Sequence, residues 1–74
     1  MKLGSIKDSG EYIISGYGNL DKDSIEELNS VGVLIGELIF INKEIKCNKN
    51  ICLIKLEIDN IAISKKLFDE IEVL

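Results

Sequence analysis

The residues of this 74-residue chain that could do chemistry are two cysteines and a short group of carboxylates. Cys47 and Cys52 flank Asn48–Asn50, a stretch typical of a hairpin loop, so the two side chains can come near each other across it. Two thiolates at this spacing suit a redox pair or half of a metal site, but a tetrahedral site takes four ligands. Cys52 also falls on an apolar strand face, where free cysteine packs as a small hydrophobe. We expect reduced, structural, buried thiols; a redox pair, or a site completed by a second protomer, is the alternative.

The carboxylates of Asp21, Asp23, Glu26 and Glu27 are hard oxygen ligands that could attract Fe²⁺. An oxygen cage needs a loop that makes its ligands converge, and these residues instead begin a helix-like pattern. Acidic side chains in a first helical turn stabilise the helix through its dipole and keep its face hydrated. We therefore assign no metal ligand and no cofactor to the chain, and direct Fe²⁺ binding remains an alternative.

Composition argues against catalysis and against nucleic acid. The chain has no histidine, the usual near-neutral acid or base, and no Gly-x-Ser-x-Gly or Walker-type loop. Nine lysines against 13 acidic residues give a net charge of −4, with no arginine and only four aromatic residues to stack on bases. We expect a protein that is not an enzyme and does not bind DNA or RNA.

The pattern of 14 isoleucines favours short strands. We expect them at residues 12–15, 37–47, 51–58, 61–63 and 71–73. Asp23 and Glu26 have the spacing of a capping box, which predicts a helix of about two turns at residues 23–31, between the first and second strands. Ser64 is placed to cap a helical turn at residues 65–68.

Two glycines mark the turns around which the chain is organised. Gly32 follows the last apolar position of the helix, where a left-handed residue ends a helix without a Cβ clash. Gly36 is placed for a tight turn directly before the long strand. Together these turns aim the helix and the strand at each other.

The strand after Gly36 begins with apolar residues on both of its faces. If Ile39 and Ile41 face the interior, Leu38 and Phe40 must point the other way. An exposed apolar patch on a small protein often marks a docking surface. The alternative is that the helix folds back and buries this face. The expected partner-binding residues are Leu34, Ile35, Leu38 and Phe40.

These elements predict an all-β fold over residues 1–74 as a single domain. Its architecture is a small SH3-like barrel of about five antiparallel strands, with one short helix between strands 1 and 2 and a helical turn near the C-terminus. A five-stranded OB-type barrel is the competitor, but it usually needs more chain.

Three stretches resemble the ferrous iron transport protein A (FeoA) family. Residues 31–36, Val-Gly-Val-Leu-Ile-Gly, are similar to that family's Leu-Gly-[Leu/Met]-x-Pro-Gly corner, with Ile35 in place of the proline. Ala62–Ser64 and Ile71–Val73 are similar to the family's ending. Leu3, Ile6, Gly10 and Glu11 are similar to its opening, so the likeness covers nearly the whole chain.

The resemblance implies an SH3-like, small cytoplasmic accessory protein of ferrous iron uptake. Such a protein acts with a membrane ferrous-iron transporter that carries a cytoplasmic GTP-binding domain, and regulates or helps assemble it. The expected partner is that domain, with weak self-association through the same apolar patch as an alternative. The first residues lack the apolar core of a signal peptide and no stretch is long enough to cross a bilayer, so we expect a cytoplasmic protein. An SH3-like fold by itself serves many functions.

Overall fold

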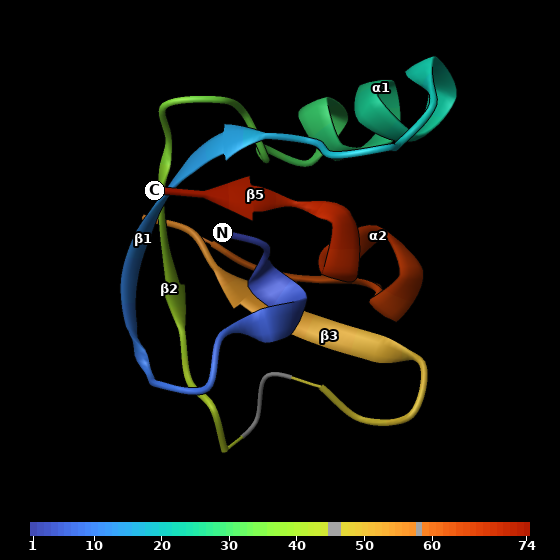
Figure 1. Ribbon diagram of the computed structural model, residues 1–74. Coiled ribbons are helices and arrows are strands. Elements are labelled where there is room, and N and C mark those ends of the chain that lie inside the picture. Colours follow the sequence, from blue (N-terminus) through green and yellow to red (C-terminus); the bar gives the residue numbers. More distant parts are fainter. Residues whose placement is uncertain (45–46, 58) are drawn as a thin grey trace.

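The computed structural model describes residues 1–44, 47–57 and 59–74 (Figure 1). Five strands form one antiparallel sheet: β1 Gly10–Gly16, β2 Leu38–Ile41, β3 Ile51–Lys55, β4 Asn60–Ser64 and β5 Glu72–Val73. Two α-helices, α1 Lys22–Ser30 and α2 Lys65–Glu70, and a 3₁₀ helix, η1 Leu3–Ser5, complete the described elements. The prediction of a mainly antiparallel sheet with a helix between the first two strands and a short helix near the C-terminus is confirmed.

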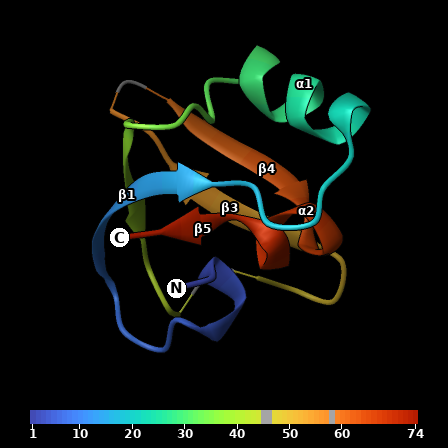
Figure 2. The same ribbon diagram turned by 45° about the horizontal axis from the view of Figure 1, so that its top comes forward.

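The sheet does not close into a barrel. Its strand order is β4-β3-β2-β1-β5, so β4 and β5 are end strands. The chain passes from one of these strands to the other through α2, which packs against η1 and β4. In Figure 2 this helix lies beside β5 at the end of β4. In a closed barrel the end strands β4 and β5 would pair with each other. Here α2 lies between them, in place of backbone hydrogen bonds.

Alternation along the strands places one face in the core. Residues 10–13 of β1 pair with residues 38–41 of β2, which buries Ile39 and Ile41 and turns Leu38 and Phe40 outward. Cys52 and Ile54 of β3 are buried in the same way opposite β4. The buried core consists of Leu3, Ile6, Ile14, Leu28, Val33, Ile39, Ile41, Cys52, Ile54, Ile63, Phe68, Ile71 and Val73.

Three predicted strands are shorter than expected, of which β5 lacks only its first residue, Ile71. β2 ends at Ile41, because the next residues form a turn in which Lys43 N–H donates to Ser9 Oγ at 3.0 Å and Glu44 N–H to Asn42 Oδ1 at 3.0 Å. β3 ends at Lys55, and Leu56 N–H then donates to Asp59 O to close the hairpin. The expected strand positions Ile45 and Ile58 lie outside the described residues.

The N-cap of α1 is Asp21, and the predicted cap, Asp23, is wrong. Asp21 Oδ1 accepts a hydrogen bond from Ser24 N–H at 2.8 Å. A start two residues earlier adds half a turn of helix and still satisfies an exposed first-turn amide. Asp23 becomes an acidic residue within the first turn, where it favours the helix through the dipole.

The other end of α1 is closed by Gly32, which has φ +98°. Val33 N–H donates to Leu28 O at 2.9 Å and Gly32 N–H donates to Asn29 O at 3.1 Å, the two bonds of a Schellman motif. Leu28 and Val33, the apolar pair of that motif, are both fully buried. The helix end is thereby fastened to the core.

The second glycine turn attaches the same segment to β1. Gly36 has φ +93°, and its N–H donates to Ile14 O at 2.8 Å. Ile14 N–H in turn donates to Glu37 O at 3.0 Å. These bonds hold the turn between α1 and β2 against the middle of the sheet.

The two chain ends lie beside each other (Figures 1 and 2). The Met1 amino group donates to Val73 O at 3.1 Å, and Val73 N–H donates to Met1 O at 2.7 Å. On its other side the C-terminal segment bonds to β1, because Leu74 N–H donates to Ile13 O at 2.9 Å. The first residues therefore join β5 at one side of the sheet.

Candidate functional site

The predicted docking residues sit at an exposed corner between α1 and β2. Ile35 is 61% exposed, Leu34 41% and Leu38 37%. Ile13 of β1, 41% exposed, is the cross-strand partner of Leu38 on the same outward face. We call these four residues, Ile13, Leu34, Ile35 and Leu38, the corner surface. The helix does not fold back over it, because the Schellman motif turns α1 away from this face of the sheet.

Phe40, the fourth predicted contact residue, is placed differently. It shares the outward face of β2 with Leu38 but is half-buried. Lys55, its register partner on β3, places Nζ 6.0 Å from the centroid of the phenyl ring. A cation over a ring face is attracted by the negative charge of that face. Phe40 therefore already has a neighbour, and we leave it outside the corner surface.

A depression of about 300 Å³ adjoins the corner surface. Leu34 and Leu38 form part of its wall, with Val31 and Leu56 completing the apolar lining. Its charged lining residues are Glu37, Glu57 and Asp59, and no lysine is among them. The corner thus combines exposed apolar area with flanking negative charge, which suits contact with an apolar and basic surface.

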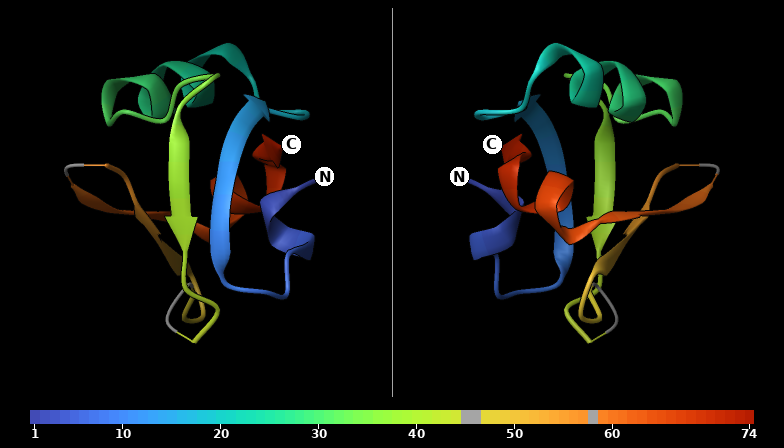
Figure 3. Two further views of the ribbon diagram at one scale, coloured as in Figure 1. Left: turned by 90° about the vertical axis from the view of Figure 1, so that its left-hand side faces the viewer. Right: turned by 90° about the vertical axis from the view of Figure 1, so that its right-hand side faces the viewer.

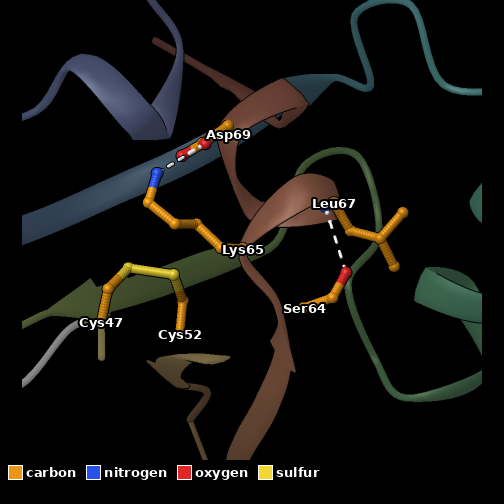
Figure 4. A network of polar contacts seen from close by, with 6 residues as sticks. All are labelled: Cys47, Cys52, Ser64, Lys65, Leu67 and Asp69. Atoms are coloured by element: carbon orange, nitrogen blue, oxygen red, sulfur yellow. Dashed lines mark hydrogen bonds and ion pairs between the residues drawn. A yellow bond between two sulfur atoms is a disulfide. The ribbon is translucent and has the colours of Figure 1, made fainter. Parts of the chain in front are cut away.

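The cysteines are joined in a disulfide, so the expectation of reduced thiols is wrong for this structure. As predicted, the loop at Asn48–Asn50 brings Cys47 and Cys52 opposite each other, as an antiparallel bridge with Cα atoms 3.9 Å apart. Figure 4 shows the disulfide beside the start of α2. Metal binding requires free thiolates, so the pair in this form is a crosslink and not a ligand set.

The acidic group at the start of α1 does not converge on a common point. Asp21 is occupied as the helix cap, and the Ser24 N–H and hydroxyl hold the pKa of its carboxyl below the ordinary value. In the described part of the chain, no three His, Cys, Asp or Glu side chains are grouped so that they could hold a metal ion. What the carboxylates Glu26 and Glu27 offer is a negative helix face.

The sequence reasoning missed Ile13 as part of the candidate site. The signal was available, because Ile13 and Ile14 are neighbours on a strand and only one of them can face the core. Ile14 is buried at 1% exposure, which leaves Ile13 outward. Its meeting with Leu38 depends on the register between β1 and β2, which local sequence does not specify.

No protein-family model, curated protein or solved structure matches the chain. Within residues 1–44, 47–57 and 59–74, no helix has the length and apolar character needed to span a membrane.

Proposed function

We propose that this chain is a protein-binding module that docks through the corner surface on the cytoplasmic domain of a membrane ferrous-iron transporter. In this role it regulates or helps assemble the transporter. An SH3-like relationship, a cytoplasmic location and the GTP-binding character of the partner domain belong to the same proposal. They come from the family resemblance of the sequence.

The observation that carries the proposal is the exposure of the corner surface on rigid backbone. Gly36 N–H and Ile14 N–H bond across the turn and β1, so Ile35 is held outward. Ordering a flexible loop on binding costs conformational entropy, and a fixed turn has already lost that freedom. Exposed apolar side chains on a fixed turn are suited to act as the anchors of an interface.

The arrangement of elements also supports the proposal. A helix lies between β1 and β2, the glycine corner follows it and a helical turn precedes the last strand, an order that is compatible with the resemblance. The family's corner motif is similar to residues 31–36, and this stretch includes the exposed apolar side chains of Leu34 and Ile35. Residues 31–36 therefore support the proposal both by their resemblance to the family and by the exposure of their apolar side chains.

Capture of the protein by the isolated GTP-binding domain, in GDP and in a non-hydrolysable GTP analogue, tests the proposal. The informative variants are Leu34→Ser and Ile35→Ser. Leu53→Ser is the matched control, because Leu53 is 43% exposed against 41% for Leu34 but lies on β3, outside the corner surface. We expect the two corner variants to lose about ten-fold or more in affinity, as anchor residues do, and the control to bind as the native chain does.

Equal binding by Leu34→Ser, Ile35→Ser and Leu53→Ser would show that the corner is not the contact. Absence of capture in both nucleotide states would contradict the choice of partner. Circular dichroism of each variant separates loss of contact from loss of fold.

A further inference from the structure

A second surface lies between α1 and the outer edge of β4. The depression there has a volume of about 210 Å³. Glu27 and Leu28 of α1 line it together with the C-cap residue Val31, and the other side consists of residues 62–64 of β4 and Leu67 of α2. In Figure 3, α1 and the hairpin of β3 and β4 project in the same direction, with the helix above the hairpin. We call this depression the β4 trough.

One wall of the β4 trough is an unpaired strand edge. β4 is the last strand of the sheet, and no described strand pairs with its outer side. Lys65 N–H donates to Asn50 O and Leu56 N–H donates to Asp59 O, at the two ends of the β3–β4 ladder. Antiparallel pairs alternate between bonded and non-bonded, so Ile61 and Ile63 bond to β3. The N–H and C=O of Ala62 consequently point into the trough.

The charged side chain in the lining of the β4 trough is the carboxylate of Glu27. Val31 also lines the depression beside the corner surface, which is therefore a neighbour of the β4 trough. The neighbouring depression is lined by the carboxylates of Glu37, Glu57 and Asp59, and neither lining includes a lysine. Lys65, which follows β4, is paired with Asp69 at 2.7 Å (Figure 4). An occupant of the trough therefore meets apolar walls and negative charge.

We infer that the β4 trough binds an extended peptide segment of another protein, apolar and bearing lysine or arginine, which adds to β4 as a further strand. Backbone bonds to Ala62 hold the segment, as in other cases of strand addition to a sheet edge. Its alternate side chains pack against Val31 and Leu67. A cationic side chain of the segment reaches the carboxylate of Glu27 at the rim.

The geometry favours a single segment over a second copy of this chain. If a second copy paired its β4 with the edge of β4, the β3 of that copy would lie on the far side of the new strand. That position is the one that α1 occupies. The chain also carries a net charge of −4, which is unfavourable for filling an acidic trough with another copy. This site is independent of the proposed function, since the variants of the corner surface leave β4 unchanged.

The test uses the full chain and a labelled, blocked heptapeptide of alternating lysine and valine, with a glutamate–valine peptide for comparison. Fluorescence anisotropy measures affinity, and amide NMR shifts locate the binding. Ala62→Pro removes the N–H that faces the trough and leaves the β3 ladder intact, because proline is tolerated at such edge positions. Ala62→Val keeps the N–H and is its control. For the rim, Glu27→Lys is compared with Glu26→Lys, which makes the same charge change outside the lining.

We expect the lysine–valine peptide alone to bind, with shifts at β4 and α1. Affinity is expected to fall about ten-fold in Ala62→Pro and about five-fold in Glu27→Lys, and to hold within about two-fold in Ala62→Val and Glu26→Lys. No binding, equal binding of the acidic peptide, or equal losses in Glu27→Lys and Glu26→Lys would overturn the inference. If the native chain forms concentration-dependent dimers and Ala62→Pro is a monomer, the occupant of the β4 trough is a second copy and not a peptide of another protein. If Ala62→Pro fails to fold, the Glu27 and Glu26 pair decides.

Discussion

Lys2 and Glu70 form an ion pair across 68 residues of sequence, with Nζ and Oε1 2.9 Å apart. The same oxygen of Glu70 accepts a hydrogen bond from Asn19 N–H at 3.0 Å. One carboxylate thus connects the first residues, the segment that enters α1, and the end of α2. The Asn19 N–H, and then Lys2, hold the pKa of Glu70 below its ordinary value of 4.5.

The Glu70 carboxylate is expected to make stability depend on pH. Because its pKa is lower in the folded chain than in the unfolded chain, the unfolded chain binds more protons in this range. The contribution is complete above pH 4.5 and is lost as the pH falls through the folded-state pKa. Urea unfolding between pH 7 and pH 3 measures how the free energy of unfolding falls with pH, and Glu70→Gln should make that fall less steep. Glu26→Gln, the same change on the exposed face of α1, should leave it steep, and equal slopes in both variants would contradict this role.

Gly36 is expected to be required for its backbone conformation alone. Its φ is +93°, and a Cβ built on it meets nothing within 4 Å. Gly36→Ala should lower the free energy of unfolding by about 1–2 kcal/mol, the cost of a left-handed residue with a side chain. Gly36→Asn should cost less, because asparagine visits this region more readily. Chemical denaturation measures both, and an unchanged alanine variant would show that the turn can adopt another conformation.

The Cys47–Cys52 disulfide is expected to stabilise the fold without being needed for it. It encloses a short loop, so the loop-closure entropy corresponds to about 2 kcal/mol. The turn has further support, since Asn48 Oδ1 accepts from Asn50 N–H and Ile51 N–H. Urea unfolding with and without dithiothreitol measures the loss, and Cys47→Ser serves as the non-reducible comparison. Complete unfolding on reduction would argue against the cytoplasmic part of the proposed function.

Local patterns predicted the elements with good fidelity. Alternation in Ile51–Lys55 placed Cys52 and Ile54 inward, and both are buried. Ser64 was expected to cap a helical turn, and its Oγ accepts from Leu67 N–H at 3.3 Å. These features depend on residues that are close together in the sequence, so local sequence patterns predict them. The same holds for the exposure of Leu34 and Ile35 at the glycine corner.

Features set by partners distant in sequence were not predicted. Whether the sheet closes depends on how far β4 and β5 lie apart, which the packing of α2 against η1 decides. Phe40 was assigned to the docking surface because strand alternation points its side chain outward. Its neighbour Lys55 is 15 positions away in the sequence, so this contact could not be foreseen. Asp21 and Asp23 were equally able to cap α1 by residue type. The unpaired edge of β4 has no local signal, because an edge is defined by the neighbour that is missing.

The pairing of the chain ends has a consequence for folding during synthesis. Met1 bonds to Val73, and Ile71 and Val73 contribute fully buried side chains to the core. A nascent chain still lacking residues 71–73 therefore leaves one edge of β1 without a neighbour and the interior incomplete. Contacts of such long sequence separation form late and slow the search for the native state. We expect the fold to become stable only once residues 71–73 have left the ribosome, so shorter nascent chains stay unfolded.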